Sequence, residues 1–206
     1  MTHHVVVRRL SFIQRHHKLL IALGGVIIGS YIVITALGPS LASLPPIQHA
    51  QQQNVYRKLA KSPITNGDRL YIPTIGVDVA IVEGKNASAL NLGAWHRQPQ
   101  NGNPIVGGNF ILSAHRFQLG KTPQGSYKRS PFYNLNKIQA GSKVWVDYHG
   151  RRYEYNVYRR YSVRPGQTEI ESTSEEAKLT LYSCSLRGPA DGREVIEALP
   201  AGTQTY

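Results

Sequence analysis

The sequence has one cysteine, Cys184, in 206 residues, so no intramolecular disulfide can form and the fold must rest on its hydrophobic core. Acidic residues are missing from the first third of the chain. No Asp or Glu precedes Asp68, although the whole chain carries a formal net charge of +12. A strongly basic chain can bind nucleic acid, but these cations are not interleaved with a nucleic-acid module. We therefore expect no nucleic-acid partner. Binding to anionic lipid headgroups or cell-wall polymers would explain the same positive charge.

Two histidine pairs, His3-His4 and His16-His17, stand in the basic N-terminal leader without a cysteine or carboxylate nearby. A structural or catalytic metal site needs three or four convergent ligands. We therefore expect no metal site and no other cofactor, and the sequence leaves calcium dependence open.

Residues 19–37 carry no charge and are almost entirely apolar, and their number is about what a helix needs to span the hydrocarbon core of a membrane. Arg and Lys precede this segment. The positive-inside rule therefore predicts that the leader, residues 1–18, is cytoplasmic and that everything after the helix is extracellular. The alternative is a cleaved signal peptide, with residues 40–43 as the small-residue cleavage site. Because the apolar run is longer than a usual signal-peptide core, we expect an uncleaved, single-pass anchor in the lipid bilayer of the cell membrane.

Residues 38–67 have the composition of a linker, with Pro45-Pro46 and a polar run over 48–54 that shows no strand alternation. A short helix over about residues 50–61 is compatible with the sequence. We expect this linker to hold the following domain clear of the bilayer. The sequence does not decide whether the linker also covers an active site.

From residue 68 to residue 206 the chain is rich in short alternating runs separated by turn residues. Strands are expected at residues 69–73, 77–82, 143–148 and 153–163. The last of these would be the longest, and one of its faces would carry Tyr153, Tyr155, Val157, Tyr161 and Val163. His149-Gly150 before it is a hairpin signal. Short helices fit at residues 86–90, 132–135 and 174–177. Many short strands predict a mostly β domain folded as a closed or nearly closed barrel.

Two apolar strands lead to residues that can do covalent chemistry. Residues 178–184 end on Cys184 and are followed by a turn-like segment, 185–192, and a short strand, 193–198. A second apolar run ends at His115. A lone cysteine is often an inert, buried residue. A neighbouring imidazole activates it by taking its proton or by stabilising the thiolate, which requires these two residues to meet in the fold.

The segment Ser113-Ala114-His115-Arg116, the segment ending on Cys184 and the strand over 193–198 occur in the order of the three signature segments of the sortases. The chain resembles this family of membrane-anchored cysteine transpeptidases of the Gram-positive cell surface. Residues 130–141 resemble the family's PF..L..L..G segment. The resemblance covers about residues 68–198 and implies an eight-stranded β-barrel. Two positions depart from the family pattern, because Ser183 replaces a common Thr and Ala114 replaces a common Gly.

The resemblance also implies roles for single residues. Cys184 would be the nucleophile, His115 the general acid/base, and Arg193 the residue that binds substrate or stabilises the oxyanion. Tyr182 and Ser183 would contact the substrate. The implied substrates are surface proteins with a C-terminal sorting signal of the LPxTG type. The acyl group would pass through a thioacyl enzyme to an amine of a cell-wall precursor or of a pilin lysine.

Alternatives stand beside these assignments. His96 is a rival base, but a similar Gly/Trp/His segment of the family has no assigned proton transfer, so we expect His96 in a loop or cleft wall. Arg187 is closer to Cys184 in sequence than Arg193 is. A papain-like protease has its Cys before its His, the reverse of the order here. A non-catalytic, membrane-anchored basic domain that binds the cell surface would leave Cys184 inert. The sequence does not specify the sortase subclass, the exact motif, the acceptor or the oligomeric state.

Overall fold

The structure, a computed structural model, describes residues 12–41 and 67–204 and, between them, positions 54, 58, 59, 61, 62 and 64. Side chains are described within 18–37 and 67–202 and at those single positions. Of the two histidine pairs, His3-His4 lies outside the described residues, as do the side chains of His16-His17.

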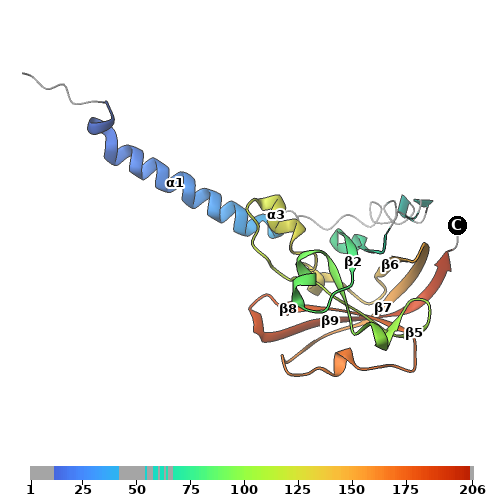
Figure 1. The fold of residues 1–206 in the computed structure, drawn as a ribbon. Coiled ribbons are helices and arrows are strands. Elements are labelled where there is room, and N and C mark those ends of the chain that lie inside the picture. Colours follow the sequence, from blue (N-terminus) through green and yellow to red (C-terminus); the bar gives the residue numbers. More distant parts are fainter. Residues whose placement is uncertain are drawn as a thin grey trace, which may run out of the picture.

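Helix α1 (Phe12–Leu41) extends away from the rest of the chain, and its C-terminal end packs against the short helix α3 (Pro123–Lys128), as Figure 1 shows. The helix predicted over residues 19–37 is present and extends beyond that range at both ends, starting within the predicted leader. Within it, Lys18–Leu37 is long and apolar enough to cross a membrane, judged by length and composition. Most side chains of this stretch are exposed.

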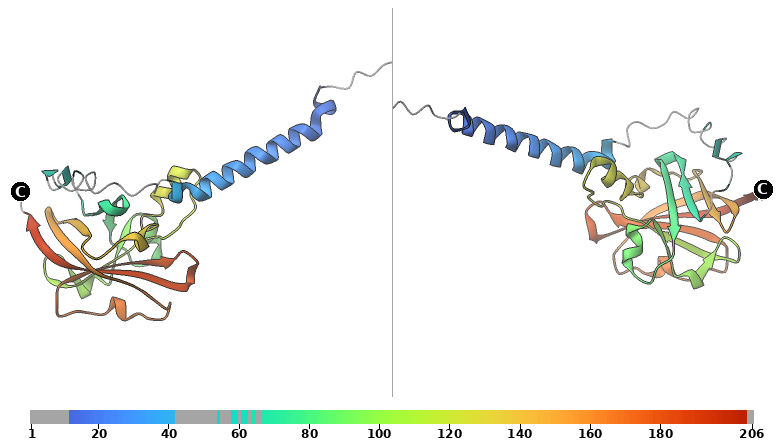
Figure 2. Two further views of the ribbon diagram at one scale, coloured as in Figure 1. Left: turned by 180° about the vertical axis from the view of Figure 1, so that it is seen from behind. Right: turned by 45° about the horizontal axis from the view of Figure 1, so that its top comes forward.

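The remaining chain forms a β-barrel. Its strands are β1 (Arg69–Ile72), β2 (Val77–Val82), β3 (Ala94–Arg97), β4 (Gly102–Asn103), β5 (Gly107–Ser113), β6 (Lys143–Tyr148), β7 (Arg151–Val163), β8 (Lys178–Ser185) and β9 (Gly188–Gln204). Neighbouring strands follow the order β3-β2-β1-β6-β7-β9-β8-β5, and pairing of β3 with β5 closes the ring. The two-residue β4 pairs with β5 at the rim. The predicted eight-stranded barrel is therefore confirmed, and Figure 2 shows it from two further sides.

Apolar side chains from all eight strands of the ring form one core inside the barrel. From outside the strands, Phe132, Leu135 and Ile138 join the same core and are at most 1% exposed. The backbone N–H of Phe132 donates a hydrogen bond to the carbonyl of His115 at 3.2 Å. The segment that resembles PF..L..L..G thus packs in the core and is tied to the backbone at His115.

The prediction that β7 is the longest strand is wrong, because β9 has 17 residues and β7 has 13. The prediction that its aromatic residues share one face is also wrong. Tyr153 lies in the barrel core, whereas Tyr161 packs against a second cluster outside it. The register of β7 against β9 shifts between Val157 and Arg159, so Tyr158 is an extra residue. Such a bulge turns the side chains that follow it to the other face of the sheet.

Helical structure in the barrel domain is short. Besides α3, it comprises the 3-10 helices η1 (Pro73–Ile75), η2 (Ala87–Asn91), η3 (Pro99–Asn101), η4 (Leu135–Lys137) and η5 (Glu169–Glu171). The helix predicted over 86–90 corresponds to η2, and the one over 132–135 is shifted to η4. Residues 174–177 are described and contain no helix, because four residues cannot recover the cost of helix nucleation without packing. The turn at His149-Gly150 is confirmed, with φ of 49° and 76°, the left-handed pair that a tight hairpin requires.

Most of the predicted linker, and with it most of the helix considered over 50–61, lies outside the described residues. The described positions 54, 58, 59 and 61 are helical. Arg152 donates hydrogen bonds to the carbonyls of Leu59 and Ser62, the latter at 3.1 Å. The same guanidinium forms a buried ion pair with Asp147 at 2.6 Å. This part of the linker is therefore bound to the β6–β7 hairpin.

Candidate active site

Residues from three separate parts of the chain lie on, or just after, neighbouring strands. Cys184 on β8 pairs directly with Arg193 on β9. Strand β5 runs parallel to β8, and its last pair joins Ser113 to Tyr182. β5 ends at Ser113, and His115 follows that pair by two residues, as Cys184 follows Tyr182 on β8. The order across the sheet is therefore His115, Cys184, Arg193.

These three side chains belong to the outer face of the barrel. An outer apolar cluster contains Ile111, Ile170, Tyr182 and Val195. Side chains on one face of a strand recur every two residues. Cys184 follows Tyr182 by two residues, Arg193 precedes Val195 by two, and His115 follows Ile111 by four, so all three share the face of the cluster. Each of them is half-buried.

The connection between Cys184 and Arg193 is shorter than the turn predicted over 185–192. Ser185 already pairs with Gly188, which leaves a two-residue turn, and β9 begins at Gly188. The register then shifts, so residues 189–192 form a bulge within β9 before Arg193 meets Cys184. The Gly/Pro sequence that predicted a loop therefore builds this bulge.

The imidazole of His115 lies against η2. Its Nε2 is 3.3 Å from Oδ1 of Asn91, and because an amide oxygen can only accept, this bond requires a proton on Nε2. Burial lowers the pKa of His115, and the nearby guanidinium of Arg129 lowers it further. At neutral pH the ring is therefore uncharged, with Nδ1 as its basic nitrogen.

The two candidate arginines differ in their surroundings. Arg193 donates from Nη1 to the carbonyls of Pro189 and Gly192 at 2.8 and 3.0 Å, so the bulge holds its guanidinium. Arg187 lies in the turn of the hairpin, its side chain is 85% exposed, and it pairs with Asp191 at 3.1 Å. Of the two, Arg193 has the fixed position beside Cys184.

Tyr182 is engaged by a polar cluster from η5 and β3. Its hydroxyl donates to Glu171, and the same carboxylate accepts two bonds of 2.8 Å from the guanidinium of Arg97. Burial raises the pKa of Tyr182, and its bond to Glu171 raises it further. Burial would raise the pKa of Glu171, but the hydrogen bonds from Arg97 and Tyr182 outweigh it, so the pKa is lowered. Arg97 in turn lies over the ring of Trp95, 4.3 Å from its centroid.

Ser183 and His96 are both buried, each 1% exposed. The hydroxyl of Ser183 donates to the carbonyl of Cys184 at 3.2 Å. The expected placement of His96 in a loop or cleft wall is wrong. It lies in β3, with Nδ1 2.7 Å from Glu83 and Nε2 3.1 Å from the carbonyl of Gly102. Its ring also packs edge-on against a core phenylalanine, so His96 is a core residue.

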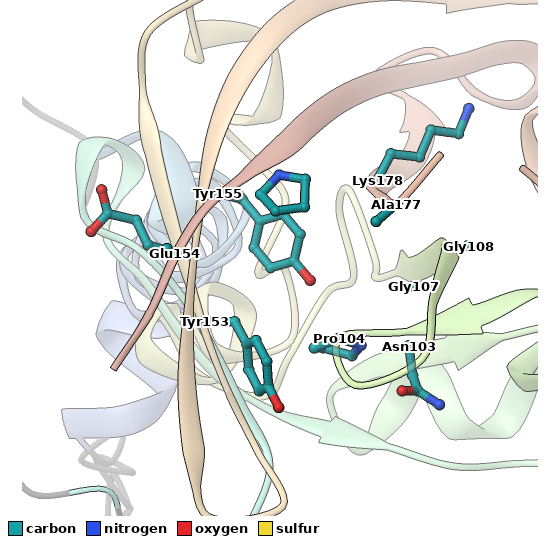
Figure 3. Close-up of a pocket in the computed structure, with 11 residues that line it drawn as sticks. Asn103, Pro104, Gly107, Gly108, Tyr153, Glu154, Tyr155, Ala177 and Lys178 are labelled. Carbon is teal, nitrogen blue, oxygen red and sulfur yellow. The ribbon is translucent and has the colours of Figure 1, made fainter. Parts of the chain in front are cut away.

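A small hollow of about 70 Å³ lies at the opposite end of the barrel. Its walls include Pro104, Gly107, Tyr153, Tyr155 and Lys178, and Figure 3 shows the two tyrosine rings on one side of it. Lys178 begins the strand that ends near Cys184. Six residues of extended chain measure about 20 Å. The hollow is therefore separate from the site described above.

A family model described as "Sortase domain" matches residues 70–201. The chain belongs to the sortase family. Sortases are transpeptidases, and the N-terminal apolar helix fits the membrane anchoring of the family. No curated protein matches the chain.

Solved sortase structures of several classes share the fold. Sortase A of Listeria monocytogenes is 18% identical, with a TM-score of 0.58 over 71% of this chain and 92% of that one. Sortase C-1 of Actinomyces oris is 23% identical, with a TM-score of 0.56 over 77% and 85%. Sortase E of Streptomyces avermitilis is 23% identical, with a TM-score of 0.52 over 69% and 90%. At these identities the likeness concerns the fold, and it spans three sortase classes.

Sequence reasoning missed Asn91, Arg97 and Glu171. Asn91 ends η2, 24 residues before the histidine it contacts. Glu171 meets Arg97 across 74 residues. No local pattern marks such contacts, since each depends on how the barrel closes. For Asn91 the sequence offered one weak indication, because a polar amide lies shortly before the strand that contains Trp95 and His96.

Proposed function

We propose that this sortase is a cysteine transpeptidase in which Cys184 is the nucleophile, His115 the general acid/base and Arg193 the oxyanion stabiliser. The observation that carries the proposal is the pairing of Cys184 on β8 with Arg193 on β9, with His115 two residues after the last β5–β8 pair. An activated nucleophile needs a base within reach, and an oxyanion needs a preorganised donor. Strand β9 supplies the donor, and the base follows the end of β5, where the N–H of Phe132 bonds to its carbonyl.

In the proposed reaction His115 accepts the proton of the Cys184 thiol, which its uncharged state allows. The thiolate attacks the scissile carbonyl of a sorting signal of the LPxTG type, and Arg193 stabilises the negative oxygen that forms. The protonated His115 then gives its proton to the departing amine, which leaves a thioacyl enzyme. An incoming amine loses its proton to His115 and attacks the thioester; the C–S bond breaks, and the Cys184 thiolate takes the proton back from His115, which restores the thiol.

The proposed substrate contacts lie on the outer face of the barrel. Tyr182 supports the proposed binding surface through its ring, because its hydroxyl already bonds to Glu171. Ser183 is buried, so we assign its contribution to the backbone beside Cys184. The proposed substrates are surface proteins that bear the sorting signal, and the acceptor is an amine of a cell-wall precursor or a pilin lysine.

We further propose that α1 anchors the chain in the cell membrane with its N-terminus in the cytoplasm and the barrel outside. The apolar stretch Lys18–Leu37 and the basic residues before it support this orientation. Protease added to intact cells should then digest the barrel and spare the leader. A protected barrel would contradict the topology.

The catalytic proposal is tested with a peptide library incubated with the full-length protein in detergent, with and without an added amine. Cleavage should depend on Cys184 and His115, and the amine should convert hydrolysed products into amides. Mass spectrometry should detect an acyl group on Cys184. Cys184→Ala should abolish cleavage and transfer, while Arg187→Ala serves as the matched control on an exposed neighbour. Turnover near wild type in Cys184→Ala would show that the nucleophile is misassigned.

A further inference from the structure

The apolar helix and the catalytic end of the barrel are in direct contact. Tyr31, within the apolar stretch of α1, donates its hydroxyl to the carbonyl of Lys121, just before α3. Thr35, one turn further along the same face, is only 4% exposed, whereas most of its helical neighbours are open. α3 follows His115 in the chain, and Arg129 at its end lowers the pKa of that histidine. The helix therefore meets the barrel domain at α3, at the end that carries His115.

This contact sets how deep the backbone at Lys121 lies relative to the membrane. If Lys18–Leu37 spans the hydrocarbon layer, Tyr31 lies about 9 Å inward of Leu37 along the helix axis, at about 1.5 Å per residue. The headgroup layer on each side of the hydrocarbon core is about 5–7 Å thick. The backbone at Lys121 is then held at or below the outer edge of the hydrocarbon layer, so the residues around it meet the boundary with the headgroups. With this placement of α1, the segment before α3 is not held clear of the bilayer by the linker.

The surface of residues 117–129 suits that boundary. Phe117 is 42% and Leu119 is 54% exposed, although both are large and apolar. Lys121, Lys128 and Arg129 are also exposed. Acidic residues are absent from the sequence throughout residues 84–146. Apolar side chains flanked by unopposed cations are the combination that binds an anionic membrane surface.

We propose that the 117–129 segment docks on the outer leaflet of the same membrane that holds α1. Phe117 and Leu119 enter the apolar boundary, and the cations contact lipid phosphates. The docking holds the end of the barrel that carries His115 and Cys184 at the bilayer surface, within reach of substrates and acceptors that are themselves bound there. The inference rests on the proposed membrane anchor and adds a second, independent contact to it.

The test uses the full chain in vesicles of equal parts phosphatidylcholine and phosphatidylglycerol, with Cys184→Ala as a cysteine-free background. A fluorophore is attached at Leu119→Cys or, as the matched control, at Val106→Cys, which is 76% exposed in the loop at the opposite end of the barrel. The label at 119 should be quenched by lipids that carry a nitroxide near the headgroup. Its quenching constant with aqueous iodide should be several-fold lower than that of the label at 106.

The outcomes separate the anchor from the docking. If the chain resists extraction from the vesicles but iodide quenches both labels equally, the anchor stands and the docking is wrong. If the chain is extracted from the vesicles, the proposed anchor and the proposed docking are both wrong. Lys121→Glu with Lys128→Glu should raise iodide quenching at 119 in these vesicles and have little effect in phosphatidylcholine alone. An equal effect in both would refute the contribution of lipid charge.

Discussion

Replacing Glu171 by glutamine tests the polar cluster beside the proposed nucleophile. This carboxylate accepts both bonds of the Arg97 guanidinium and the hydroxyl of Tyr182, and so ties η5 to β3 and β8. Glutamine has nearly the same shape but no charge. The N–H groups of its amide would face partners, Arg97 and Tyr182, that also donate. The substitution therefore removes the ion pair with little change in packing volume.

The expected loss follows from the burial of the pair. Breaking a fully buried ion pair by removing one partner costs about 3–5 kcal/mol. The Arg97 and Glu171 side chains are 27% and 14% exposed, so solvent reduces the cost, and we expect about 2 kcal/mol. In a domain of this size that loss lowers Tm by about 6 °C.

The assay is thermal and urea unfolding of the barrel domain at neutral pH, together with a double-mutant cycle that includes Arg97→Met. The coupling energy between the two positions should exceed about 1 kcal/mol. Tyr182→Phe, which keeps the ion pair and removes one hydroxyl, should cost about 1 kcal/mol. KM for a sorting-signal peptide should rise more than kcat falls, because η5 supports the face beside Cys184.

The stability difference between wild type and Glu171→Gln should also depend on pH. Since the pKa of Glu171 is lowered in the folded protein, its contribution is complete above the pKa of the unfolded chain and is lost as pH falls through the folded pKa. Wild type and Glu171→Gln should therefore converge in stability at acidic pH. A loss below about 0.5 kcal/mol at neutral pH, within the usual range for surface substitutions, would refute the reasoning.

Three further predictions concern single side chains. Arg193→Ala should lower kcat on a sorting-signal peptide about 100- to 1,000-fold, and Arg193→Lys should not rescue it fully, with Arg187→Ala nearly normal; a crippled Arg187→Ala would reverse the assignment. Arg129→Gln should raise the pKa of His115 and move the acid limb of the pH–rate profile to higher pH; an unmoved limb would exclude the electrostatic contact. Burial opposes ionisation of Glu197, yet hydrogen bonds from surrounding cations and a tyrosine lower its pKa to about 2. The stability that this carboxylate contributes above about pH 4.5 should therefore be lost toward pH 2. Urea unfolding across that range should show a less steep decline in Glu197→Gln than in wild type.

The sequence predicted those features that depend on local alternation. β2 and β6 begin and end where the pattern placed them, because each strand has one apolar face and is bounded by turn residues. It failed where one residue interrupts the alternation. Tyr158 gives no local sign that it is a bulge, yet it moves Tyr161 out of the core. The end of β9 was missed because it pairs with the start of β7, Gln204 with Arg152, far earlier in the chain.

For the site, the resemblance supplied Cys184, His115 and Arg193; the fold pairs Cys184 with Arg193, and His115 follows the end of the strand on the other side of β8. Their neighbours could not be predicted. The burial of His96 follows from β3 pairing with both β2 and β5, and closure of the barrel is a non-local event. The partners of Tyr182 depend on where η5 packs, which no alternation of the sequence encodes.

The parallel pairing of β5 with β8 has a consequence for the order of folding. A parallel pair cannot be joined by a hairpin, and here the whole β6–β7 hairpin intervenes between the two strands. Contacts of such long sequence separation form late, after the entropy of closing the loop between them has been overcome. Cys184 and Arg193 come together early, in a local hairpin, whereas His115 joins them only when the ring closes. With the proposed assignment of His115 as the base, we therefore expect the Cys184 thiol to gain that base only when the ring closes.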